Sequence, residues 1–144
     1  MKKIFLTLLL VFISMFGACA KSNYIEEPSK IKNTYIQKGY DVEEARTADD
    51  IASLMRLGDM TFSKVSKIIL AWDERTDASY AVILFFEDTK SAKKALKKIE
   101  SELEDIQNYF EGSSRKVDKS DFQCARQGEI VYFAFHDALD YLEK

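Results

Sequence analysis

Along the chain of 144 residues, some segments have apolar residues in the arrangement typical of β-strands, and others have them at the spacing typical of α-helices. Two apolar, β-branched and aromatic runs, KIILAW at 67–72 and YAVILFF at 80–86, predict strands joined by the turn-rich segment DERTDAS. A second pair, KVDKSDFQCA at 116–125 and EIVYFAF at 129–135, predicts another hairpin with its tight turn at Gln127-Gly128. We therefore expect two β-hairpins.

Helical spacing of apolar residues predicts four further segments. Residues 29–38 form a helix that stops at Gly39, and a Thr47–Asp50 capping box opens a helix that ends near Gly58. A long helix is expected over about 89–110 and a short amphipathic one over 136–144. With YDVEEA at 40–45 as a short strand, the pattern predicts the α+β class. Its sheet is mainly antiparallel, has about four to five strands built from two hairpins, and carries packed helices.

The predicted strands are apolar on both faces. In 79–86, Val82 and Leu84 point one way while Ala81 and Ile83 point the other. A sheet with one solvated face alternates apolar with polar residues, so this pattern favours helices on both faces. The alternative is an apolar face offered to a second copy or to a partner groove.

The amino terminus carries the pattern of an export signal. Lys2 and Lys3 precede an apolar run at 4–16, which is shorter than the roughly 20 residues that a bilayer-spanning helix needs. Ala18-Cys19-Ala20 fits the small-x-small pattern of ordinary cleavage, which would release a soluble chain beginning at Lys21.

The same segment also fits a second kind of processing. Phe16-Gly17-Ala18-Cys19 resembles the lipobox of bacterial lipoproteins, although Phe16 stands where that family usually has leucine or a similar aliphatic residue. The resemblance implies that Cys19 is acylated on sulfur and that the chain is cut just before it. It also implies that the lipid attaches the protein to the outer side of a bacterial membrane. It implies a signal peptide at 1–18 and a lipid-anchored tether at 19–28. The length and the pattern of the remaining chain predict a single α+β domain at 29–144. Elsewhere the chain is similar to small uncharacterised bacterial lipoproteins only in layout, so the resemblance implies no active site.

The net charge argues against a nucleic-acid-binding protein. Without Lys2 and Lys3 the chain has 19 basic and 24 acidic residues, a net charge of −5, whereas a nucleic-acid surface would carry a basic excess. Cys124 lies in a predicted strand, where a cysteine usually acts as a small core hydrophobe. If Cys19 is acylated, Cys124 has no partner; if Cys19 stays free, a Cys19–Cys124 bridge is conceivable in an oxidising compartment.

The sequence shows no catalytic constellation. It contains one histidine, His136, which is expected to flank the last helix, and its five glycines are too scattered for a phosphate-binding loop. The acidic residues of the 73–77 turn lack the spacing of a calcium loop. We expect no catalytic, metal-binding or cofactor-binding residues and no cofactor.

The long helix has a charge distribution that opposes its dipole. Lysines crowd its first half and acidic residues its second, whereas helices favour the reverse. One interpretation is an interaction patch facing lipid headgroups or an anionic polymer; the alternative, which we favour from the sequence, is a solvated face whose small penalty tertiary packing offsets. The residues of this patch are Lys90, Lys93, Lys94, Lys97 and Lys98.

These observations predict an extracytoplasmic, membrane-tethered lipoprotein that acts as a non-catalytic binding or interaction module. The expected contacts are the membrane, through lipid on Cys19, and a protein or cell-wall partner, with no nucleic acid. The alternative is a secreted small enzyme or inhibitor released by cleavage after Ala20. The ligand and the oligomeric state do not follow from the sequence.

Overall fold

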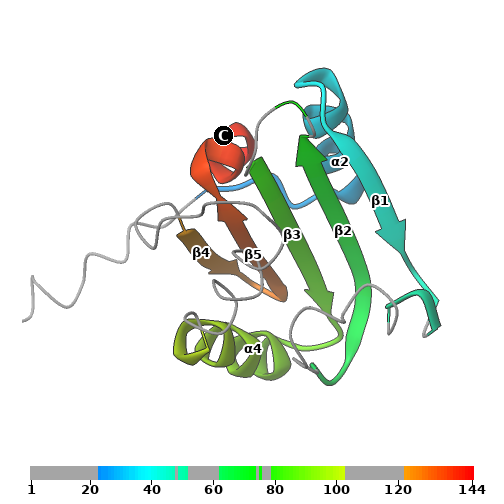
Figure 1. Cartoon of the computed structure of the whole chain (residues 1–144). Coiled ribbons are helices and arrows are strands. Elements are labelled where there is room, and N and C mark those ends of the chain that lie inside the picture. The colour runs from blue at the N-terminus through cyan, green and yellow to red at the C-terminus, as the bar shows by residue number, and fades with distance from the viewer. Residues whose placement is uncertain (1–22, 48, 52–61, 74, 76–78, 103–121) are drawn as a thin grey trace, which may run out of the picture.

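The computed structural model describes residues 23–47, 49–51, 62–73, 75, 79–102 and 122–144. The elements along the chain are α2 (Pro28–Gln37), β1 (Asp41–Ala45), β2 (Val65–Asp73), β3 (Ser79–Phe86), α4 (Thr89–Ser101), β4 (Phe122–Gln127), β5 (Ile130–Phe135) and the 3₁₀ helix η2 (His136–Leu142). Figure 1 shows the strands side by side, with α4 below them and with α2 and η2 at the upper end of the view.

The described strands form one antiparallel sheet in the order β1-β2-β3-β5-β4. β2 and β3 make the first hairpin and β4 and β5 the second. The hairpins join through β3 and β5, where Ile83 is opposite Tyr132, and β1 extends the sheet beyond β2. The expected α+β class, with a mainly antiparallel sheet of two hairpins and packed helices, is confirmed.

One face of the sheet packs against α4. Val82 and Leu84 of β3 and Val131 and Phe133 of β5 form a buried cluster with the residues on the inner side of the helix. Those residues are Ala92, Ala95 and Ile99. Their spacing of three, four and seven places them on one helical stripe, so the apolar pattern of this segment is explained by burial.

The other face packs against α2 and η2. Ile83 and Tyr132 form a buried cluster with Ile31 and Tyr35 of α2 and with Leu139 of η2. Neighbouring residues of β3 and β5 thus enter different clusters, as the alternation of strand side chains requires. In the described part of the chain, helices cover both faces, which is why both faces of these strands are apolar.

Helix α2 lies one residue earlier than the predicted 29–38 and ends, as expected, before Gly39. Pro28 occupies its first turn, where the missing N–H costs nothing, and Gly39 follows its carboxyl end with φ +84°. Buried Tyr35 donates a hydrogen bond to the Ala138 carbonyl oxygen at 2.8 Å, which joins α2 to η2. This bond fixes the two covering elements to each other.

Some predicted boundaries shift or fall outside the description. β4 ends at Gln127 and β5 begins at Ile130, so the hairpin loop is Gly128-Glu129, one residue later than predicted. Gly128 has φ +57°, and glycine suits the first loop position of a type II′ turn. The closing helix is a 3₁₀ helix. The predicted helix over 89–110 is described to Ser101, and the helix after Thr47 only to Ile51.

Two helix starts have side-chain caps, and the one at Thr47 is the predicted capping box. The Thr47 hydroxyl accepts a hydrogen bond from the Asp50 amide at 3.2 Å and donates one to the Asp50 carboxylate at 2.5 Å. Asp88 precedes α4, and its carboxylate accepts from the Ser91 amide at 2.7 Å. Both caps satisfy amides that the first helical turn leaves without partners.

Candidate functional site

Four of the five lysines predicted as an interaction patch lie on the outer face of α4. Its inner side is buried, whereas Lys90, Lys93, Lys94 and Lys97 are exposed. These four residues, hereafter the lysine face, are spaced by three and four positions, which places them in one stripe opposite the sheet. None of them forms an ion pair with another residue in the described ranges. The stripe therefore presents ammonium groups to solvent.

The fifth lysine has different surroundings. Lys98 is half-buried, and its Nζ lies 5.9 Å from the ring centroid of Phe62 and 3.8 Å from a carboxylate oxygen of Glu102. Its ammonium group is thus shared between a cation–π contact and an ion pair. Lys98 belongs to the packed flank of α4, and the outward stripe consists of the other four lysines.

The amino-terminal segment Asn23–Glu27 is packed against the domain. Buried Tyr24 forms a β-bridge with Glu143, and its ring lies 5.1 Å from that of Tyr132. The Tyr24 amide donates to the Gln127 side-chain oxygen at 2.9 Å. The folded domain therefore includes residues that the sequence pattern assigned to the tether.

Further hydrogen bonds tie this segment to the carboxyl end of the chain. The Ile25 amide donates to the Leu142 carbonyl oxygen at 2.8 Å, and the Lys144 amide donates to that of Asn23, also at 2.8 Å. The Tyr132 hydroxyl donates to the Ile25 carbonyl oxygen at 3.0 Å. Asn23 is thus held beside the carboxyl terminus, on the sheet face that carries Tyr132.

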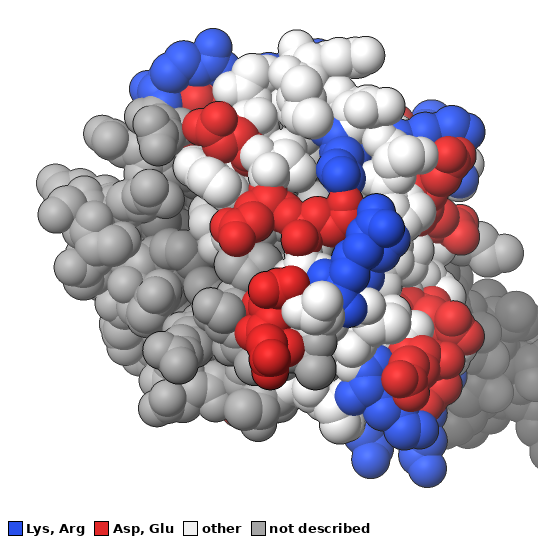
Figure 2. Space-filling model, turned by 90° about the vertical axis from the view of Figure 1, so that its right-hand side faces the viewer, with Lys and Arg blue, Asp and Glu red and all other residues white. Residues whose placement is uncertain are grey.

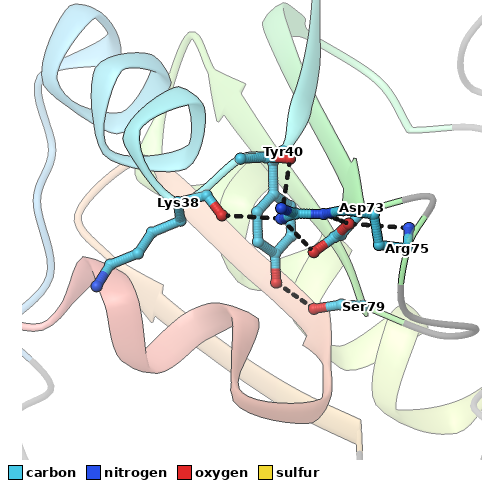
Figure 3. Close-up of polar contacts among 6 residues, drawn as sticks. Lys38, Tyr40, Asp73, Arg75 and Ser79 are labelled. Atoms are coloured by element: carbon cyan, nitrogen blue, oxygen red, sulfur yellow. Dashed lines mark hydrogen bonds and ion pairs between the residues drawn. The ribbon is translucent and has the colours of Figure 1, made fainter.

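A cluster around Arg75 joins the β2–β3 turn to the end of α2. The guanidinium contacts both carboxylate oxygens of Asp73, at 2.9 and 3.0 Å, and donates to the carbonyl oxygens of Lys38 and Gly39 at 3.2 and 3.3 Å. Figure 3 shows Arg75 between these groups and, below it, the hydrogen bond between the Tyr40 and Ser79 hydroxyls. The hydrogen bonds from Arg75 lower the pKa of Asp73. The cluster joins the β2–β3 turn to the end of α2, and the Asp73 carboxylate is already paired with Arg75.

A second charged cluster surrounds Glu44 on β1. Its carboxylate contacts Lys32 of α2 at 2.5 Å, Arg46 at 2.6 Å and Lys67 of β2 at 3.5 Å. The hydrogen bond from Arg46, with that from Lys32, lowers the pKa of Glu44 to about 2 despite desolvation. Figure 2, which looks onto the β1 side, shows acidic and basic groups interspersed. This side is balanced in charge, unlike the outer face of α4.

The two cysteines and the histidine considered in the sequence lie apart from these clusters or outside the described residues. Cys124 is half-buried in β4, and burial, together with nearby Glu100, raises the pKa of its thiol to about 12. Such a thiol is unreactive at neutral pH. Cys19 lies outside the described residues, and His136 begins η2 at the end of β5.

In the described ranges, no three His, Cys, Asp or Glu side chains converge as a metal site would require. None of the helices described there has the length and apolarity that a bilayer-spanning segment needs.

Sequence reasoning found the lysines of α4 but missed the Arg75 and Glu44 clusters and the packing of Asn23–Glu27. Gly39 was recognised only as a helix stop, since nothing local indicates that a residue 36 positions later uses the space beside it. Glu44 is two residues from Val42 in β1, so both side chains point to the α2 side of the sheet. The partners of Glu44, however, come from three segments of the chain, which no local pattern indicates. Comparison with protein-family models, with curated proteins and with solved structures finds no match to this chain.

Proposed function

We propose that this chain is an exported lipoprotein, anchored by lipid on Cys19 to the outer side of a bacterial membrane, whose domain is a non-catalytic binding module. The observation that carries the proposal is the sequence of the amino terminus: a basic start, a short apolar run and then Gly17-Ala18-Cys19. Two or more acyl chains on such a cysteine would anchor the protein stably, because each buried CH₂ contributes about 0.8 kcal/mol.

The proposal of a binding module is supported by a contrast, within the described part of the domain, between charged groups that are paired and lysines that are not. The Asp73 and Glu44 carboxylates are occupied by arginine and lysine side chains that connect separate elements. The lysine face of α4, in contrast, is directed to solvent and serves no packing purpose in the described residues. Exposed like charges on one stripe favour a role in contacting an anionic partner over a role in stability.

The mass of the amino-terminal peptide from the native membrane fraction tests the anchor. We expect a peptide that begins at Cys19 and is heavier by a diacylglycerol. A soluble product that begins at Lys21, without lipid, would contradict the lipoprotein assignment and favour the secreted enzyme or inhibitor.

A cysteine replacement gives the matched comparison. Cys19→Ser removes the acylated thiol but keeps the Ala18-x-Ala20 pattern, so the variant should leave the membrane fraction and begin at Lys21. Cys124→Ser, which alters the other cysteine, should remain membrane-bound. If both variants stay in the membrane fraction, lipid on Cys19 is not the anchor.

A further inference from the structure

The amino-terminal segment and the lysine face lie on opposite faces of the sheet. Tyr24 packs on Tyr132, which belongs to the cluster beneath α2 and η2. Helix α4 packs on Val131 and Phe133, the two neighbours of Tyr132 in β5. Because successive strand side chains point to opposite faces, the sheet separates Tyr24 from α4. Any anchor attached ahead of Asn23 therefore pulls on the face away from the lysines.

The chain between Cys19 and the folded domain is too short to reverse this arrangement. Asn23 is held by the Lys144 amide, and four residue steps separate it from Cys19. Fully extended, four steps reach at most about 14 Å. A domain resting with its lysine face on the membrane would hold Asn23 beyond one helix layer of about 10–12 Å and one sheet layer of about 10 Å. The required distance of roughly 20 Å exceeds that reach.

The charges agree with this orientation. Around the amino-terminal segment the exposed charged groups are of both signs: Glu26, Glu27, Glu143 and Lys144. Lys144 Nζ lies 3.9 Å from a Glu26 carboxylate oxygen. That surface offers no basic excess to anionic headgroups. The four ammonium groups of the lysine face, in contrast, run along the eight residues from Lys90 to Lys97, or about 10 Å of helix. A row of that kind matches repeated negative charges along a chain better than one small anion.

We propose that the lysine face of α4 binds an anionic polymer of the cell envelope on the side of the domain turned away from the anchoring membrane. This inference rests on the proposed lipid anchor for its direction, whereas the affinity of the lysine face for a polyanion does not depend on the anchor. The lysines act as point charges that neutralise successive anionic groups of the polymer.

The affinity is tested with the mature protein in neutral phosphatidylcholine vesicles and long-chain inorganic polyphosphate as the probe. Replacing Lys90, Lys93, Lys94 and Lys97 by glutamine should weaken binding at least 10-fold. It should also reduce the slope of log K against log salt concentration by roughly 3, at about 0.7–0.9 per lost contact. The matched control replaces Lys30, Lys32, Lys38 and Lys144 by glutamine, which changes the net charge equally and leaves α4 and its Asp88 cap unaltered.

Equal loss in both variants, or no binding by the parent protein, would overturn the assignment of a polyanion surface. Circular dichroism of both variants separates lost binding from lost folding. If the native protein proves to begin at Lys21, the same assay applies to that soluble product. The anchor and the lysine face can therefore fail independently.

The direction is tested by fluorophores in the lipidated Cys124→Ser protein, attached through Lys94→Cys or Glu143→Cys. The vesicles contain phosphatidylcholine and phosphatidylglycerol at 3:1, with a quencher on the headgroups. We expect quenching at position 143 and little at position 94. Strong quenching at position 94 that disappears without phosphatidylglycerol would instead place the lysine face on the anchoring bilayer and overturn the proposed direction.

Discussion

The guanidinium of Arg75 occupies the space in which a side chain on Gly39 would begin. A Cβ atom built on Gly39 would lie 2.5 Å from Arg75 Nη2, and the backbone of Gly39 has φ +84°. The same nitrogen accounts for both hydrogen bonds to the carbonyl oxygens at the end of α2. Gly39 is therefore favoured by its backbone conformation, and a side chain there would also force the exposed Arg75 guanidinium away from its two carbonyl partners.

Gly39→Ala should destabilise the domain by more than the roughly 1–2 kcal/mol that a left-handed conformation costs an alanine. Urea unfolding followed by the fluorescence of Trp72, the single tryptophan, measures the change in free energy. Gly128→Ala is the matched control, since Gly128 has φ +57° but nothing within 4 Å of its Cβ position. In an Arg75→Ala background the excess at position 39 should disappear; equal losses at both glycines in the parent protein would refute the clash.

Glu44→Gln should lower stability at neutral pH by about 1–2 kcal/mol, because Lys32, Lys67 and Arg46 lose their common carboxylate. The folded-state pKa of about 2 lies below the ordinary 4.5, so the charged group contributes stability that is complete above about pH 4.5. That contribution is lost as the pH falls from 4.5 toward 2.

The free energy of unfolding of the Glu44→Gln variant should therefore fall less steeply than that of the parent between pH 4.5 and 2. Urea unfolding at several pH values measures this slope. Glu43→Gln, at the exposed neighbouring position of β1, should leave the acid dependence nearly unchanged. Parallel curves for the parent and Glu44→Gln proteins would show that the cluster does not act through the charge of Glu44.

Tyr35→Phe should cost about 1–1.5 kcal/mol, because the buried Ala138 carbonyl oxygen loses its 2.8 Å hydrogen bond while the ring remains in place. Tyr141→Phe, at an exposed ring in η2, is the control and should be close to neutral. Hydrogen exchange should show the loss of protection concentrated in α2 and η2, the two elements that this bond joins. An unchanged unfolding free energy would argue against the bond.

Cys124 should react slowly with a thiol reagent in the folded protein. With its pKa raised to about 12, little thiolate is present at pH 8, and we expect modification by 5,5′-dithiobis(2-nitrobenzoate) to be roughly 100-fold or more slower than after unfolding in guanidinium chloride. The same cysteine in unfolded protein provides the reference rate. Equal rates in the two states would show that the thiol is accessible and ionised normally.

Local pattern sufficed for several features because each depends on residues close together in the chain. Gly39 follows the end of α2, the Thr47–Asp50 capping box opens the next helix, and the apolar spacing of α4 marks its inner stripe. The two-sided apolarity of β3 and β5 likewise indicated that both sheet faces are covered, because an exposed face would carry polar residues. The lysine face could be predicted for the same reason, since helical spacing alone brings its four residues together.

Tertiary structure decided what depends on segments far apart in sequence. Only the placement of β5 beside β3 determines which residues of the two hairpins meet, as Ile83 and Tyr132 do. Only the packing of Tyr24 on Tyr132 shows that the segment from Asn23 lies on the sheet face opposite α4. Residue type and spacing report local conformation and burial, whereas strand order and facing sides depend on long-range contacts that no short stretch encodes. The sequence thus predicted the five lysines from which the face is drawn. The tertiary structure excluded Lys98 from it and decided that the face lies across the sheet from Asn23.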